Sequence, residues 1–145
     1  MEGQPTLRHA FTIFELTVTL CIMSVLSAIA MPWAGKLLDR VHVRGAVIET
    51  EALFSSARHI AIARSAQSAV DIDTAENSIR VSVGGEIVRT GRIGSDHDVR
   101  LGATRLHMSY SPTGMAYGAA NLSVFVRRSS AADTVFVSRL GRLRH

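Results

Sequence analysis

Residues 11–33, with the sequence FTIFELTVTLCIMSVLSAIAMPW, decide the fold. They carry one charged residue, Glu15, and the next charge along the chain is Lys36. A helix needs roughly 20 apolar residues, at about 1.5 Å of rise each, to cross the hydrocarbon core of a bilayer. The stretch therefore predicts a membrane-spanning helix. A helix buried in a soluble core is the alternative, but it would show a polar face every third or fourth residue.

Residues 1–10 precede this run as a short polar leader that carries Arg8 and His9. A secretory signal peptide places its small-residue cleavage site after the apolar stretch. Here the small residue, Ala10, comes directly before Phe11. We therefore expect the leader to be removed between Ala10 and Phe11, with the apolar helix retained.

This arrangement resembles the prepilins and pseudopilins, the subunits of type IV pili and of the type II secretion pseudopilus. The resemblance rests on Ala10, Phe11, Thr12, Ile13, Glu15 and Pro32. It implies cleavage by a prepilin peptidase, N-methylation of Phe11, and assembly with other pilins or pseudopilins in a filament. Ala10 stands where the family strongly prefers glycine.

Glu15 lies in the apolar run, where a carboxylate costs roughly 2.5 to 3.5 kcal/mol on insertion scales. Cleavage after Ala10 would create a free amine on Phe11, one helical turn before this acid. A neighbouring subunit could then present its own amine to the carboxylate, which is the pairing that the family uses in assembly. The alternative is that Glu15 lies at the membrane surface and extends towards water.

The charges that flank the helix conflict with the leader motif. Lys36, Arg40 and Arg44 follow the helix, and the positive-inside tendency alone would place the part after them in the cytoplasm. The leader motif implies the opposite orientation, and we follow it. The expected location is the inner membrane, crossed once, with the C-terminal domain in the periplasm and the subunit incorporated into a periplasmic or surface filament.

The helix is expected to continue beyond Pro32, which removes one backbone donor. Residues 34–66 predict an amphipathic helix whose apolar positions include Leu38, Val41 and Ile48, with polar residues such as Asp39 and Glu49 turned away. Beyond Ala66 the period of the pattern becomes two. Residues 67–145 therefore predict a β-rich domain, and the fold class is α+β: a long helix packed against an antiparallel sheet.

The predicted strands are short and separated by turn residues. Residues 69–73 and Ser78–Val83 form an expected hairpin, with the inward residues Val70, Ile72, Ile79, Val81 and Val83. The other expected strands are residues 86–90, 100–101, 105–110, Asn121–Arg128 and 134–140. Residues 91–98 predict a mobile polar loop, and residues 129–133 a second loop.

No cofactor or metal site is expected. The single cysteine, Cys21, lies in the apolar run, and the six histidines are scattered without zinc spacing. No phosphate-binding loop or nucleophile motif is present. His97 with Asp96 and Asp98, or Ser111 with His107, lacks a third partner at a recognisable spacing, so we expect no enzyme.

The C-terminal part carries the positive charge. From Ser78 to His145 there are ten arginines and four acids. Fifteen of the sixteen basic residues of the chain are arginine, a preference over lysine that a GC-rich genome would also produce. Residues 111–144 resemble the secretion protein H and FimT-like branch of the family, whose FimT-like minor pilins bind DNA through a G-R-x-R tail. The matching candidates for contacts to DNA phosphates are Arg142 and Arg144, helped by Arg139, Arg127 and Arg128.

Two functions follow from these resemblances. The first is a minor pseudopilin of the type II secretion system, involved in protein secretion, whose tail arginines cap the sheet or pair with acids of a neighbouring subunit. The second is a minor type IV pilin that binds DNA for uptake. We favour the first, because no aromatic stacking platform is recognisable beside the tail.

Overall fold

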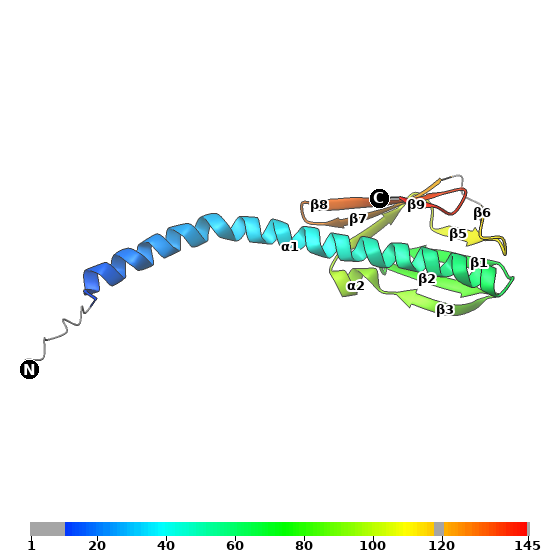
Figure 1. Cartoon of the computed structure of the whole chain (residues 1–145), viewed down its shortest axis with the longest axis horizontal. Coiled ribbons are helices and arrows are strands. Elements are labelled where there is room, and N and C mark those ends of the chain that lie inside the picture. Colours follow the sequence, from blue (N-terminus) through cyan, green and yellow to red (C-terminus); the bar gives the residue numbers. More distant parts are fainter. Residues whose placement is uncertain (1–10, 118–120, 145) are drawn as a thin grey trace, which may run out of the picture. The chain divides into compact units, whose positions relative to one another are not determined.

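The structure is a computed structural model that describes residues 11–117 and 121–144. The chain divides into two compact units, Met1–Gly35 and Lys36–His145. One helix, α1, runs from Ile13 to Ala63 and belongs to both units (Figure 1). Its 51 residues include Pro32, which does not end it. The predicted continuation of the helix beyond Pro32 is confirmed.

The first unit is the apolar half of α1. The helix begins with Thr12, whose Oγ1 accepts a hydrogen bond from the backbone N–H of Glu15 at 3.2 Å. This is an N-cap, which satisfies one of the free donors of the first turn. Thr17, Thr19 and Ser24 donate their hydroxyl protons to carbonyls three residues earlier. These three hydroxyl groups are therefore satisfied locally, as a lipid environment requires.

The second unit holds the rest of α1, two antiparallel sheets and a short helix. One sheet has the order β3-β2-β1-β5-β6 and the other β4-β7-β8-β9. The strands are β1 Ser68–Asp73, β2 Ser78–Val83, β3 Glu86–Gly91, β4 Arg100–Ala103, β5 His107–Tyr110, β6 Ala116–Tyr117, β7 Asn121–Arg128, β8 Ala131–Ser138 and β9 Leu143–Arg144. The short helix, α2, spans Ile93–His97.

The β1–β2 hairpin forms as predicted, with Ser68 opposite Val83 and Asp73 opposite Ser78. The carboxylate of Asp73 accepts hydrogen bonds from the N–H groups of Ala75 and Glu76, both at 3.0 Å, and so closes the turn. The hydrogen bond from Glu76 is the main cause that lowers the pKa of Asp73. The predicted inward residues are all buried: Val70, Ile72, Ile79, Val81 and Val83.

The core lies between α1 and both sheets, but the buried face of α1 is not the predicted one. Leu38, Val41 and Ile48 are 55%, 61% and 59% exposed. The buried residues of the helix are Val43, Ala46, Val47, Thr50, Leu53, Phe54, Ala57 and Ala61. This face is rich in alanine, and small side chains let the helix backbone approach the sheets closely. Helical spacing of apolar residues alone therefore predicted the wrong face of the helix.

The boundaries of several elements differ from the prediction: β5 begins at His107 instead of residue 105, β8 ends at Ser138 instead of residue 140, and strands β6 and β9 were not predicted. Helix α1 ends at Ala63 instead of Ala66, because Ser65 adopts a positive φ of 48° and the N–H of Ala66 bonds to the carbonyl of Ala61. The stretch 91–98 is not a loop throughout: it contains α2, which buries Ile93 completely. Strand β8 begins at Ala131, so the turn before it is shorter than expected.

Candidate functional site

The apolar half of α1 presents a single acid. The most apolar 18-residue window of this helix has a mean hydropathy of 2.1, and none of it is buried. It is a candidate membrane anchor. Phe11 is 80% exposed, and Glu15 lies one turn further along with no ion-pair partner among residues 11–117 and 121–144. Ala10, the residue before the predicted cleavage site, lies outside the described residues.

Thr12, one of the residues that carry the family resemblance, also has a structural role that was not predicted from the sequence. Its side chain caps α1 through the N–H of Glu15, and the pattern Thr-x-x-Glu before an apolar run is the sequence signature of such a cap. The cap fixes the first turn, which is the turn that carries Glu15. The acid is therefore held at the helix start, where the helix dipole favours a negative charge.

The C-terminal arginines belong to a folded strand and not to a free tail. After β8 the chain turns through Gly141, whose φ is +71°, and returns along β8 as β9. The N–H of Ser138 bonds to the carbonyl of Arg142 at 2.9 Å, and Arg144 lies opposite Phe136 in the register. Gly141 thus makes a tight turn, and the chain after it folds back onto the sheet.

Gly141 has a second role that the sequence did not show. A Cβ placed on it would lie 3.1 Å from the carbonyl oxygen of Gly114 and 3.2 Å from Cε1 of Tyr110. Tyr110 is completely buried, and burial raises its pKa to about 12. The first residue of the G-R-x-R pattern is therefore a packing residue, which seats the turn against the core.

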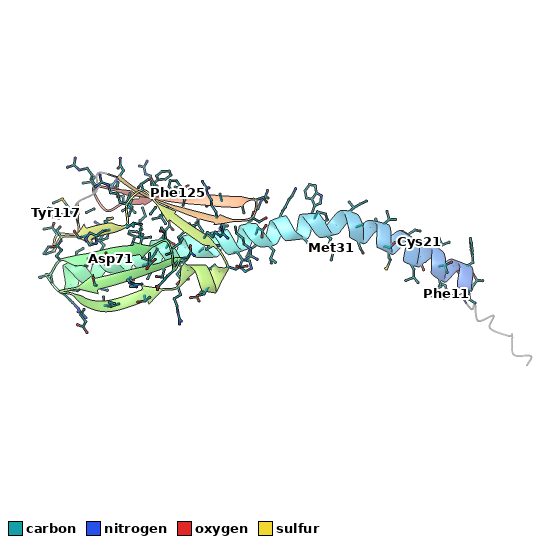
Figure 2. The ribbon with its side chains drawn as sticks, turned by 180° about the vertical axis from the view of Figure 1, so that it is seen from behind. Phe11, Cys21, Met31, Asp71, Tyr117 and Phe125 are labelled. Atoms are coloured by element: carbon teal, nitrogen blue, oxygen red, sulfur yellow. The ribbon has the colours of Figure 1, made fainter. Side chains whose placement is uncertain are left out.

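The tail arginines share a groove with an aromatic side chain. Arg142 and Arg144 line it together with Phe136 and Leu140, which are 51% and 59% exposed. Phe125, on the neighbouring strand β7 (labelled in Figure 2), pairs with Thr134, two residues from Phe136, and therefore lies on the same face of the sheet. The expectation that no aromatic platform accompanies the tail is therefore wrong. Sequence spacing could not reveal it, because the pairing of β8 with β9 creates it.

Of the three supporting arginines, Arg128 is engaged inside the domain. Its Nε donates to Asp39 of α1 at 2.9 Å, and its Nη1 contacts a carboxylate oxygen of Asp98 at 2.8 Å. The same nitrogen donates to the carbonyls of His97 and Asp98. With 20% of its side chain exposed, Arg128 joins β7, α1 and the end of α2. It is not available to DNA phosphates.

Arg127 and Arg139 remain exposed. Arg127 lies opposite Arg100 in the register and one residue from Arg128 along β7. Because successive side chains of a strand point to opposite faces, Arg127 faces solvent while Arg128 faces α1. Arg139 lies in the turn before Gly141, and its carbonyl accepts a hydrogen bond from the N–H of Ala116.

The helix α2 is fixed to α1 by two histidine contacts. His97 Nε2 lies 2.7 Å from Glu49 Oε2, and His42 Nδ1 lies 2.9 Å from the carbonyl oxygen of His97. Together with the Arg128–Asp39 pair, these contacts hold the acids of α1 against the domain. Asp39 and Glu49 were predicted to face away from it. That prediction is wrong, because α1 buries a different face from the predicted one and so brings Asp39 and Glu49 next to the domain.

The residues considered for catalysis are not brought together. His97 contacts Glu49 instead of Asp96. His107 Nδ1 lies 2.6 Å from Asp71, whereas the hydroxyl of Ser111 lies 2.7 Å from that of Thr113. Within residues 11–117 and 121–144, histidine, cysteine, aspartate and glutamate form no group of three or more that could hold a metal ion.

Known proteins resemble this chain in structure but not in sequence. No protein-family model and no curated protein matches the sequence. The type IV minor pilin FimU of Pseudomonas aeruginosa matches with a TM-score of 0.63 and 12% identity, over 74% of this chain and 90% of that one. A second crystal form of FimU gives 0.59 and 11%, over 70% and 90%.

The minor pseudopilin EpsH from the type 2 secretion system of Vibrio cholerae matches with a TM-score of 0.56 and 9% identity, over 71% of this chain and 94% of that one. At such low identity the likeness shows the fold alone. The chain thus has the pilin-like α+β fold that its sequence predicted, the fold of a type IV minor pilin and of a minor pseudopilin.

Proposed function

We propose that the chain is a minor pseudopilin, a structural subunit of a type II secretion pseudopilus. The observation that carries this proposal is the apolar half of α1, which is wholly exposed and has one acid in its first turn. Such a surface is stable only in lipid or among other helices, and an acid within it needs a cationic partner. Cleavage before Phe11 by a prepilin peptidase, followed by its N-methylation, would supply the amine.

A second apolar stripe supports the same proposal. Leu38, Val41 and Ile48 lie on the side of α1 that faces away from the sheets and are more than half exposed. They recur at intervals of three and seven residues, which places them along one helix face. We infer that neighbouring subunits cover this stripe, so that it continues the helix contacts of the apolar half within a filament. The expected arrangement is one inner-membrane span with the folded unit in the periplasm.

The second candidate is a minor type IV pilin that binds DNA for uptake. The observation that favours it is the exposure of Arg142 and Arg144, which form no ion pair among the residues described. Their positive charge and their groove suit phosphates. In the first candidate function the same arginines would instead meet acids of a neighbouring subunit.

Deletion of the gene in its native host separates the two candidates. Loss of proteins from the culture supernatant with normal natural transformation supports the secretion role. Loss of transformation with normal secretion supports the DNA role. A deletion strain that is normal in both respects contradicts both. Complementation with the wild-type gene is the control, and complementation with Glu15→Leu should fail in either case.

A further inference from the structure

The outer face of the β4-β7-β8-β9 sheet carries a row of arginine and phenylalanine side chains, which we call the Phe–Arg strip. It consists of Arg100 of β4, Phe125 and Arg127 of β7, Phe136 of β8, and Arg142 and Arg144 at β9. The strip lies on the sheet surface that is turned away from the core and from α1. The subunit contacts proposed along α1 would therefore leave this face uncovered.

The strand register sets the order of these residues. Arg100 lies opposite Arg127, and Gly102 lies opposite Phe125. Phe125 pairs with Thr134, two residues from Phe136, so the two rings are diagonal neighbours on one face. Arg144 lies opposite Phe136 on the other side. The strip therefore has two aromatic rings at its centre and two arginines at each end.

The four arginines and Phe136 of the strip are exposed, and Phe125 is half-buried. Phe136 is 51% exposed, and none of the four arginines forms an ion pair within residues 11–117 and 121–144. A shallow groove lined by Phe125, Arg127 and Phe136 also includes one acid, Asp133, which accepts a hydrogen bond from the N–H of Thr134. The local charge is thus strongly positive around an apolar centre.

This combination fits a polyanion that also carries flat rings. Three strand spacings of about 4.8 Å and four residues of about 3.4 Å give the strip a diagonal of about 20 Å. That length accommodates about four nucleotides, the small end of the range for single-strand sites. Duplex DNA or an acidic peptide would use the arginines but would leave the rings without stacking partners.

We propose that the Phe–Arg strip binds single-stranded nucleic acid, with bases stacked on Phe125 and Phe136 and phosphates paired with the arginines at both ends. This proposal rests on the second candidate function and deepens it: it names the ligand as a single strand and moves its contacts from a tail to a sheet face. Because four arginines take part, the slope of log K against log salt should be about −3.

The test uses the full chain in neutral detergent micelles and a labelled thymidine oligomer of about 12 nucleotides. Fluorescence anisotropy compares this single strand with a duplex of equal length. The main variant is Phe125→Leu with Phe136→Leu, which keeps apolar bulk and removes the rings. Phe136→Leu alone serves as the second variant. The side chain of Phe136 is half exposed, so we expect the domain to stay folded without its ring. Tyr117→Leu, at an exposed tyrosine of the other sheet, is the matched control.

We expect the double variant to weaken single-strand binding at least about tenfold and Phe136→Leu at least about fivefold, from the stacking contribution of each base. Tyr117→Leu should bind as the wild type does. Less than a twofold loss in the double variant overturns the proposal. If Arg142→Ala with Arg144→Ala then still weakens binding, the arginine-based DNA function survives without stacking. If neither the single strand nor the duplex binds to the wild-type protein, the DNA-binding function is contradicted as well. The role as a filament subunit is tested separately by the deletion strain.

Discussion

Arg127 and Arg128 are adjacent on β7, but replacing each by alanine should change the stability of the domain to very different extents. Arg128→Ala removes the partner of Asp39 and the donor to two carbonyls, whereas Arg127→Ala removes an exposed side chain without an ion pair in the described structure. Arg128 is thus a structural residue and Arg127 a surface residue. The two variants form a matched comparison, because each replaces one arginine by alanine on the same strand.

The expected loss of stability follows from the contacts of Arg128. Breaking a buried ion pair costs about 3 to 5 kcal/mol, because an uncompensated charge remains. About a fifth of each side chain is exposed, 20% for Arg128 and 18% for Asp39, so water screens part of this cost. The contact to Asp98, whose side chain is 84% exposed, adds little. We therefore expect Arg128→Ala to lower the free energy of unfolding by about 2 to 3 kcal/mol, and Arg127→Ala by less than about 0.5 kcal/mol.

Thermal unfolding of the full chain in neutral detergent, followed by circular dichroism, measures this difference. A loss of 2 to 3 kcal/mol should lower Tm by about 10 °C for a unit of this size, with no resolvable shift for Arg127→Ala. Asp39→Asn should cost less in the Arg128→Ala background than in the wild type, because the carboxylate is already unpaired there. Equal shifts for the two arginine variants, or no loss in Arg128→Ala, would refute the structural role.

Three further predictions concern the turn, the core and the helix surface. Gly141→Ala should lower the free energy of unfolding by about 1 to 2 kcal/mol, from its positive φ and the approach of the new Cβ to Gly114, and an unchanged Tm would contradict this. The raised pKa of Tyr110 means that the unfolded state loses its phenol proton first, so stability should fall between about pH 10 and 12, by about 3 kcal/mol at most. Tyr110→Phe should lack this pH-dependent loss of stability. Val41→Asp should keep the wild-type Tm yet fail to enter filaments, whereas Val43→Asp, at a buried position, should fail to fold. Normal entry of Val41→Asp into filaments would show that the exposed stripe does not contact neighbouring subunits.

The sequence predicted those parts of the fold that depend on local periodicity. Strands β1 and β2 have an alternating pattern, and their inward residues Val70 and Ile79 are completely buried. The five-residue helix α2 is too short to show a helical period, so residues 91–98 looked like a loop. The available signal in the sequence was Ile93 itself, an apolar residue between turn residues, which the structure buries.

The contacts that join distant segments could not be predicted. Asp39 and Arg128 are 89 residues apart, and no spacing rule connects them. The same holds for Phe136 and Arg144, which become neighbours because β9 returns along β8. A helix with two apolar stripes also leaves open which one is buried, because packing against the sheets decides it. Local patterns therefore determined the elements, whereas the candidate binding face arose from their pairing.

We propose above all that the exposed apolar helix is a processed filament segment whose Glu15 meets a terminal amine. Mass spectrometry of the protein extracted from membranes of a host with an active prepilin peptidase tests it most directly. We expect the chain to begin at Phe11, with a methyl group on its amine. A protein that retains residues 1–10 under these conditions would contradict the account, because Glu15 would then lack the cation that assembly requires.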